Sequence, residues 1–347
     1  MKKIISIFSL TIFIIGVVFI IILNTIIIPD NQYDEAVLLM ERGQYEDALS
    51  AFEILGDYKD SAEKIFQCNE AIRDGKYNNA IAFMKDKQYM EAISLFESLD
   101  GYKDSAAKIT ECTYQNAVFR MDAGDVIEAY ETLISLNGYQ DSFEKAKSIY
   151  DQYKAEKLRS PEVGDYVFFG TYEQDNNMSN GKEDIEWLVL EVTDGKALLI
   201  SRYVIDAQSY NYQNEKTYWE ESPLREWLNS EFLNGAFSDS EKEKIPIVIS
   251  TERYKIQDQV FLLSFGEAEK YFDSSSDRQC TATMYAKEKG AAANDGYCAW
   301  WLWDYVSTNN KNYHVLDCVY YDGDLDYPLS SHHDIGIRPC IWIDLKT

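Results

Sequence analysis

The sequence begins with an almost unbroken apolar segment that runs from Ile4 to Ile28. A helix needs about 20 apolar residues to cross the hydrocarbon core of a bilayer, so this segment is long enough with some tilt. Lys2 and Lys3 precede it, and only acidic charges stand between it and Arg42. Because basic residues stay on the cytoplasmic side, we expect a single-pass protein of the cell membrane with a cytoplasmic N-terminus and an extracellular bulk.

A cleaved secretory signal peptide is the alternative for this segment. The apolar region of a signal peptide is usually about 7–15 residues long and ends at a small-x-small cleavage site. Here the apolar segment is longer, and the residues from Asn24 to Pro29 contain no such site. We therefore favour an uncleaved signal anchor over residues 1–30, which makes the membrane the first expected partner.

Residues 31–159 contain an internal repeat. The hexapeptide Gly56–Ser61 recurs in related form at Asp100–Ser105 and Asn137–Ser142, so the units are spaced 44 and then 37 residues apart. Apolar residues upstream of the turn follow a helical period, as at Ala48 and Phe52. Periods of this length are typical of helical solenoids, in which each unit buries its apolar face against its neighbour. We therefore predict an all-α segment here.

The repeated turn carries the signals that end one helix and start the next. Glycine favours the helix end, and Asp-Ser favours the following start. Asp60 with Glu63, and Asp141 with Glu144, are spaced for an Asp variant of the capping box. On these turns and helices, the segment Tyr33–Leu158 resembles divergent tetratricopeptide repeats. The resemblance implies a peptide-binding scaffold or a spacer, and the short array favours a spacer.

The six cysteines fall into two groups. Cys68 and Cys112 occupy one repeat position, which Ile149 fills in the third unit, so a buried core site is predicted for both. The other four lie in the C-terminal domain, and four cysteines outside the membrane allow two disulfides with three connectivities. The disulfides we expect are Cys280–Cys298 and Cys318–Cys340.

Strand signals replace the helical pattern in residues 160–347. The dipeptide Asp194-Gly195 between two β-rich segments is a strong signal for a two-residue hairpin turn. Short helices and antiparallel strands together predict an α+β domain. The expected elements are strands at Ile185–Val192 and Lys196–Tyr203, helices from Pro223 and over about Ser264–Tyr271, a second hairpin turning at Asp322-Gly323, and a closing strand over Ile337–Leu345.

An ordered set of motifs runs through this domain. They are Val163-Gly164-Asp165-Tyr166, Glu186-Trp187-Leu188-Val189-Leu190, Leu224-Arg225-Glu226-Trp227-Leu228-Asn229, Trp300-Trp301-Leu302 and Gly336-Ile337-Arg338-Pro339. The set resembles the bacterial domain of unknown function numbered 6273, which is common in clostridial surface proteins, over about Val163–Leu345. A more distant similarity is to C-type-lectin-like folds, including formylglycine-generating enzymes. It implies a lectin-like fold, and the family name implies no activity.

Composition and motifs exclude several functions. The chain carries 33 basic and 59 acidic side chains, a formal net charge of −26, so it lacks the basic surface that nucleic acid binding requires. An enzyme needs a positioned nucleophile, acid–base pair or metal, and we identify no catalytic residue, cofactor or metal site. His332 and His333 are adjacent, so on a strand they would point to opposite faces rather than share an ion.

The abundant tyrosines suit a recognition surface, because each offers a large contact area with a polar tip. In the lectin-like relatives, the portion that corresponds to Trp300–Asp334 forms the exposed ligand face. We assign Trp300, Trp301 and Trp342 to the core. The candidate ligand-binding residues are Trp303, Tyr305, Tyr313, His314, Tyr320, Tyr321 and Tyr327.

Together these features predict a membrane-anchored, extracellular, non-catalytic binding module for a glycan or a protein. The predicted architecture is multidomain: a single N-terminal transmembrane helix (residues 1–30), all-α tetratricopeptide-like repeats as a stalk (31–159) and an α+β C-type-lectin-like domain (160–347). One alternative is an envelope assembly or regulatory protein that acts through protein contacts of its repeats. The other is a lectin-fold enzyme, which we disfavour because no catalytic motif is evident.

Overall fold

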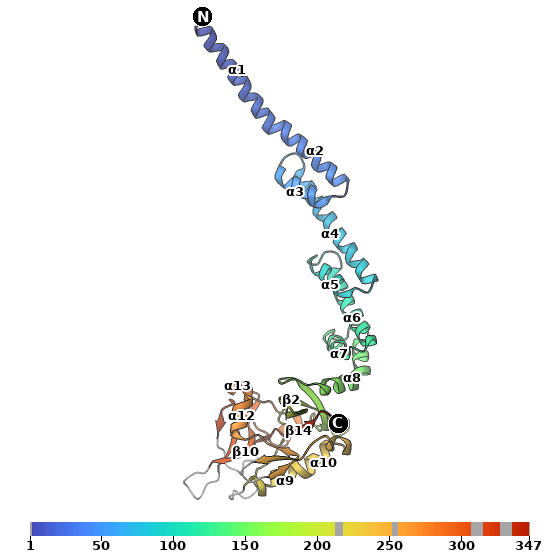
Figure 1. Cartoon of the computed structure of the whole chain (residues 1–347), viewed down its shortest axis with the longest axis vertical. Helices are drawn as coiled ribbons and strands as arrows, with labels where there is room; N and C mark the ends of the chain where they lie inside the picture. Colours follow the sequence, from blue (N-terminus) through green and yellow to red (C-terminus); the bar gives the residue numbers. More distant parts are fainter. Residues whose placement is uncertain (1, 212–217, 252–255, 307–314, 327–334, 347) are drawn as a thin grey trace. The chain divides into compact units, whose positions relative to one another are not determined.

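The computed structural model divides the chain into two compact units, Met1–Ile149 and Tyr150–Thr347 (Figure 1). The first is built of helices and the second is rich in β-sheet, as the sequence predicts. The units divide within helix α8 rather than after it, because Tyr150 and Tyr153 pack against Phe168 with ring centroids 6.0 and 6.3 Å away. The structure describes residues 2–211, 218–251, 256–306, 315–326 and 335–346.

One continuous helix opens the chain. It consists of α1 (Lys2–Ile22), the π-helical turn η1 (Leu23–Ile27) and α2 (Ile28–Glu41). The large apolar side chains from Ile12 to Ile22 are exposed, and the helix is long and apolar enough to cross a membrane. Asn24 and Thr25 donate to backbone carbonyls one turn earlier, at 3.0 and 2.7 Å. Pro29 has no N–H to donate to the backbone carbonyl one turn earlier. The missing hydrogen bond accounts for the π-helical turn before it.

Six further helices follow, and consecutive helices pack against each other around three small apolar cores. Phe52 and Phe96, which are equivalent in the repeat, are fully buried in separate cores. Cys68 and Cys112 are fully buried as predicted, and Ile149 packs against the third core. The helices are α3 (Tyr45–Leu55), α4 (Ser61–Lys85), α5 (Tyr89–Glu97), α6 (Ser105–Ala123), α7 (Val126–Ser135) and α8 (Ser142–Arg159).

A phenol–carboxylate contact, not a capping box, holds the repeated turn. Asp60 is the N-cap of α4, yet its side chain makes no capping hydrogen bond, so the capping box predicted with Glu63 is wrong. The carboxylate instead accepts the hydroxyl of Tyr33, which lies 27 residues earlier. The same contact recurs in the other two units and ties each turn to the second helix upstream of it. These pairs are Tyr77 with Asp104 and Tyr114 with Asp141.

We predict that Tyr77→Phe lowers the thermal midpoint of the helical unit by about 2–4 °C at pH 7, because Asp104 loses its phenol donor. This hydrogen bond holds the pKa of Asp104 below its usual value. The stabilisation is therefore complete above the unfolded-state pKa of about 3.9 and is lost as the pH falls through the lower folded-state pKa. Circular dichroism melts at several pH values test this, with Tyr45→Phe as the control. An equal melting difference at every pH would contradict the explanation.

The second unit contains two five-stranded sheets and two small two-stranded ones. The first sheet has the order β1 (Tyr166–Tyr172), β2 (Glu183–Thr193), β3 (Lys196–Ser201), β14 (Cys340–Asp344) and β7 (Val260–Phe261). The second has the order β12 (Leu325–Asp326), β11 (Val315–Val319), β10 (Trp300–Val306), β13 (Gly336–Ile337) and β4 (Asp206–Ala207). The small sheets pair β5 (Val248–Thr251) with β6 (Ile256–Asp258), and β8 (Ala293–Asn294) with β9 (Tyr297–Cys298).

Both predicted hairpins are present. Asp194 and Gly195 turn the first with φ values of 52° and 75°, the left-handed values that such a turn requires. The predicted closing strand, however, is divided between the two sheets as β13 and β14. Pro339 cannot donate to a ladder at the division. Arg338 is buried there, donates from Nε to the Ser201 carbonyl at 3.1 Å and links the two sheets.

Short helices cover the sheets, and one apolar core lies among them. Trp187, Trp300 and Trp301 are fully buried, and each indole N–H donates to a backbone carbonyl. Trp342, predicted as core, is partly buried against it. The helices are η2 (Trp219–Glu221), α9 (Pro223–Trp227), η3 (Leu228–Phe232), α10 (Leu233–Ala236), α11 (Asp239–Lys242), α12 (Phe265–Tyr271), α13 (Ser275–Arg278) and α14 (Met284–Glu288).

The two predicted disulfides are not formed in the structure. Cys280, Cys298 and Cys340 are free thiols, and all four cysteines are buried. Cys318 and Cys340 lie in different sheets, on β11 and β14. Cys280 and Cys298 are close in the backbone, since the Cys298 N–H donates to the Cys280 carbonyl at 2.7 Å. Burial raises the pKa of both thiols, which keeps them protonated as small apolar core residues.

Candidate ligand-binding groove

The predicted ligand face is described only in part. Tyr313, His314 and Tyr327 lie outside the described residues, as does the side chain of Tyr305, whose backbone belongs to β10. Tyr320 and Tyr321 follow β11 with ring centroids 4.4 Å apart, and Tyr320 is exposed. Trp303 packs against the core from a partly buried position. The aromatic ligand face therefore stays a prediction.

Trp303 adjoins a partly buried acidic cluster, which we define as Glu220, Asp304 and Asp317. Its carbonyl accepts the Tyr210 hydroxyl at 3.1 Å, and the three acids surround this phenol closely enough to raise its pKa further, although burial is the main cause. The Trp303 indole N–H and one oxygen each of Glu220 and Asp317 are buried without a hydrogen-bond partner. Burial raises the pKa of Asp304 to about 6, and burial together with nearby Asp304 raises that of Asp317 to about 7.

A different part of the second unit forms a concave, polar groove of about 570 Å³. Four segments far apart in sequence build it: the end of β1, strand β4, the consecutive helices α9 and η3, and helix α14. Its walls combine aromatic rings with hydrogen-bonding side chains. The lining residues are Tyr172, Asp206, Gln208, Pro223, Glu226, Trp227, Ser230, Glu231, Phe232, Tyr285 and Lys289.

Local sequence signals position the helical walls. Ser222 caps α9 by accepting the Leu224 N–H at 3.2 Å, with Pro223 at the first helical position. Thr283 likewise caps α14 by accepting the Ala286 N–H at 3.1 Å. On the third side, a register shift between Phe168 and Thr171 bends β1 just before it delivers Tyr172.

Tyr172 and Asp206 form the polar centre of the groove. The Tyr172 hydroxyl donates to Asp206 Oδ2 at 2.6 Å, and the Ala207 N–H donates to Oδ1 at 2.7 Å. Burial raises the pKa of Asp206, while the Tyr172 hydrogen bond opposes that rise. Burial and Asp206 also raise the pKa of Tyr172, so its phenol stays neutral. This centre therefore offers fixed acceptors and a hydroxyl at the floor.

Aromatic rings surround this centre. The Tyr285 ring stands edge-on to Tyr172 with centroids 5.8 Å apart, and Lys289 Nζ lies 5.2 Å from the Tyr285 centroid. Phe232 is buried in the groove wall and packs against both Tyr172 and Trp227, with ring centroids 5.2 and 5.5 Å apart. Partly exposed rings beside carboxylates, an amide and an ammonium suit a ligand with flat apolar faces and many hydroxyls.

A group of three acids beyond Tyr172 is close enough to hold a cation. Glu173, Asp175 and Glu183 place carboxylate oxygens within 4.8 Å of one another. Backbone N–H groups already donate to all three, for example Asn177 to Glu173 at 2.8 Å and Gln174 to Glu183 at 2.7 Å. These hydrogen bonds explain why the three carboxylates lie close together: they hold the loop that carries them.

Sequence reasoning missed the groove as a site. Trp227 stood out only as a motif residue, and the aromatic side chains of Trp227 and Tyr172 were the available signal. Asp206 lies between apolar residues, and an acid in such a setting indicates a buried polar role. Tyr285 and Lys289 carried no signal, because only the fold brings α14 to the other elements.

The fold and the groove define a two-unit protein: a helical half that begins with one apolar helix, and a sheet-rich half that carries a concave polar site. Residues 194–345 of that second half match the family described as Domain of unknown function (DUF6273). The match confirms the resemblance of the C-terminal domain from the Asp194-Gly195 turn onward. Comparison with curated proteins and with solved structures found no match.

Proposed function

We propose that this protein is a membrane-anchored, extracellular and non-catalytic binding module, and that its groove binds a saccharide. The groove is the observation that carries the proposal. At about 570 Å³ it falls within the range of about 300–1,000 Å³ that is typical of small-ligand sites, whereas protein partners bury broader and flatter surfaces. Sugar rings have apolar faces for Trp227 and Tyr285 and hydroxyls for Asp206.

The rest of the architecture supports display at the cell surface. The apolar helix supplies an anchor, and the bases before it with acids after it favour a cytoplasmic N-terminus. The recurrent Tyr–Asp contacts make the helical half a series of similar units, which supports a tetratricopeptide-like stalk. The order of motifs supports a C-type-lectin-like fold for the domain that the stalk carries.

A glycan-array and calorimetry experiment on the full chain in lipid nanodiscs tests the proposal. We predict that Trp227→Ala weakens binding to the best saccharide at least about tenfold, because it removes an aromatic wall in a concave site. Asp206→Asn should weaken it as well, since the fixed charged acceptor is lost. Tyr320→Ala is the matched control, because this exposed aromatic lies outside the groove. Unchanged binding in both groove variants would overturn the assignment.

A further inference from the structure

A second cavity in the sheet-rich unit lies apart from the groove and shares no lining residue with it. Its volume is about 310 Å³. It is formed by the last turn of α8, strand β1, the segment after α11 and the chain around β14. The lining residues are Ala155, Leu158, Arg159, Phe169, Lys244, Ile343, Asp344, Leu345 and Lys346.

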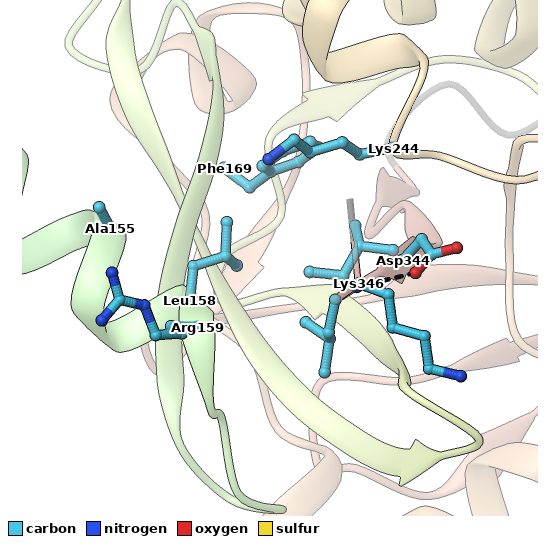
Figure 2. Close-up of a pocket in the computed structure, with 9 residues that line it drawn as sticks. Ala155, Leu158, Arg159, Phe169, Lys244, Asp344 and Lys346 are labelled. Atoms are coloured by element: carbon cyan, nitrogen blue, oxygen red, sulfur yellow. Dashed lines mark hydrogen bonds between the residues drawn. The ribbon is translucent and has the colours of Figure 1, made fainter.

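The walls of this cavity combine apolar and charged side chains, and the charges are mainly basic. Leu158, Phe169, Ile343 and Leu345 supply hydrocarbon surface. Three of the lining residues are basic and one is acidic, in a chain whose formal net charge is −26. Figure 2 labels Leu158, Phe169, Lys244, Asp344 and Lys346 among the residues around the cavity.

The basic residues differ in what already engages them. Arg159 pairs with Glu156 at 3.1 Å, and Lys346 Nζ donates to the Asp194 carbonyl at 2.9 Å. Asp344 accepts the Lys346 backbone N–H at 2.9 Å. Lys244, by contrast, forms no ion pair with any residue that the structure describes. Lys244 and Phe169 both line the cavity (Figure 2).

We infer that this cavity is a second ligand site, for a small amphiphilic carboxylate. The carboxylate pairs with the Lys244 ammonium, and the hydrocarbon part lies between Leu158 and Phe169. An anion that brings its own apolar part gains an ion pair with the ammonium and burial against the apolar side chains. The volume lies at the lower end of the range for small-molecule sites, which suits one short chain rather than a two-chain membrane lipid.

The test uses the full chain in nanodiscs, with hexanoate as the probe and hexanamide, of the same length but uncharged, as its partner. Saturation-transfer NMR and calorimetry should show hexanoate binding at least about tenfold more tightly than hexanamide, after subtraction of empty nanodiscs. Lys244→Met should remove that preference, and Lys244→Arg should keep it. Lys242→Met is the matched control, because this lysine lies on α11, pairs with Asp239 and does not line the cavity.

Equal binding of the two probes to the unmodified protein would overturn the inference, whatever the variants do. Hexanoate binding that survives in Lys244→Met would overturn the assigned residue and therefore the site. Trp227→Ala should leave hexanoate binding unchanged, because Trp227 does not line this cavity. The test of this site is therefore independent of the test of the saccharide groove. Circular dichroism of each variant confirms that a lost preference is not a lost fold.

Discussion

A variant that lacks residues 2–28 is expected to move almost entirely from the membrane fraction to the soluble fraction. The segment is one continuous helix whose large side chains from Ile12 to Ile22 find no cover in the protein. Each central Leu, Ile, Phe or Val favours insertion by about 0.3–0.6 kcal/mol, and such residues make up most of the segment. Their sum is sufficient for stable insertion, and the rest of the chain has a strongly acidic, water-compatible composition.

Carbonate extraction followed by immunoblotting measures this partition. The matched control replaces Ile12 to Ile22 by a leucine–alanine segment of equal length, which should keep the protein in the membrane because length and hydropathy decide insertion. Mass spectrometry of the unmodified protein determines where its N-terminus lies and so tests for cleavage of the segment. A soluble form that begins near Pro29 would show that the segment is a cleaved signal peptide and would contradict the anchor.

The features that the sequence predicts well are those that depend on neighbours in the chain. The apolar N-terminal helix, the hairpin turn at Asp194-Gly195 and the helix start at Pro223 all follow from short-range rules, and the structure contains each of them. The burial of Cys68 and Cys112 was predictable for a related reason. Comparison with Ile149 at the equivalent repeat position revealed an apolar site without any knowledge of the fold.

The features that sequence reasoning missed depend on contacts between distant residues. Asp60 satisfies the local rule for a capping box, yet its carboxylate accepts the hydroxyl of Tyr33 from α2, the second helix upstream. The groove is a stronger case. Tyr172, Asp206 and Tyr285 come from three elements, and no spacing in the chain indicates that they meet. Periodicity predicts which face of an element is buried, but not which elements lie side by side.

Stability of the sheet-rich unit is expected to fall as the pH rises from about 4 to 8, and Asp317→Asn is expected to remove much of that fall. Asp317 is 4% exposed and one of its oxygens has no hydrogen-bond partner, so the folded state disfavours its charged form. Its folded-state pKa is about 7, against about 3.9 in the unfolded chain. Between these values the unfolded state has released the proton and the folded state retains it.

The sign of the effect follows from that difference in bound protons. Below pH 4 both states are protonated and Asp317 contributes no pH dependence. From there to about pH 7 each pH unit lowers the free energy of unfolding by up to about 1.4 kcal/mol, and the total is about 2–4 kcal/mol. Asparagine stays neutral throughout, so Asp317→Asn should flatten this part of the profile. Asp304, with a pKa of about 6, leaves a smaller slope in the variant.

Urea unfolding followed by tryptophan fluorescence between pH 4 and 8 measures the profile, since Trp300 and Trp301 lie in the same core. Asp322→Asn is the matched control, because this exposed aspartate lies on the turn after β11. It should retain the unmodified slope. The comparison rests on slopes and not on absolute stability, because the new amide must also find hydrogen-bond partners in a buried place. If Asp317→Asn kept the full slope, the carboxylate would have to be ionised in the folded protein, with a partner that compensates its charge.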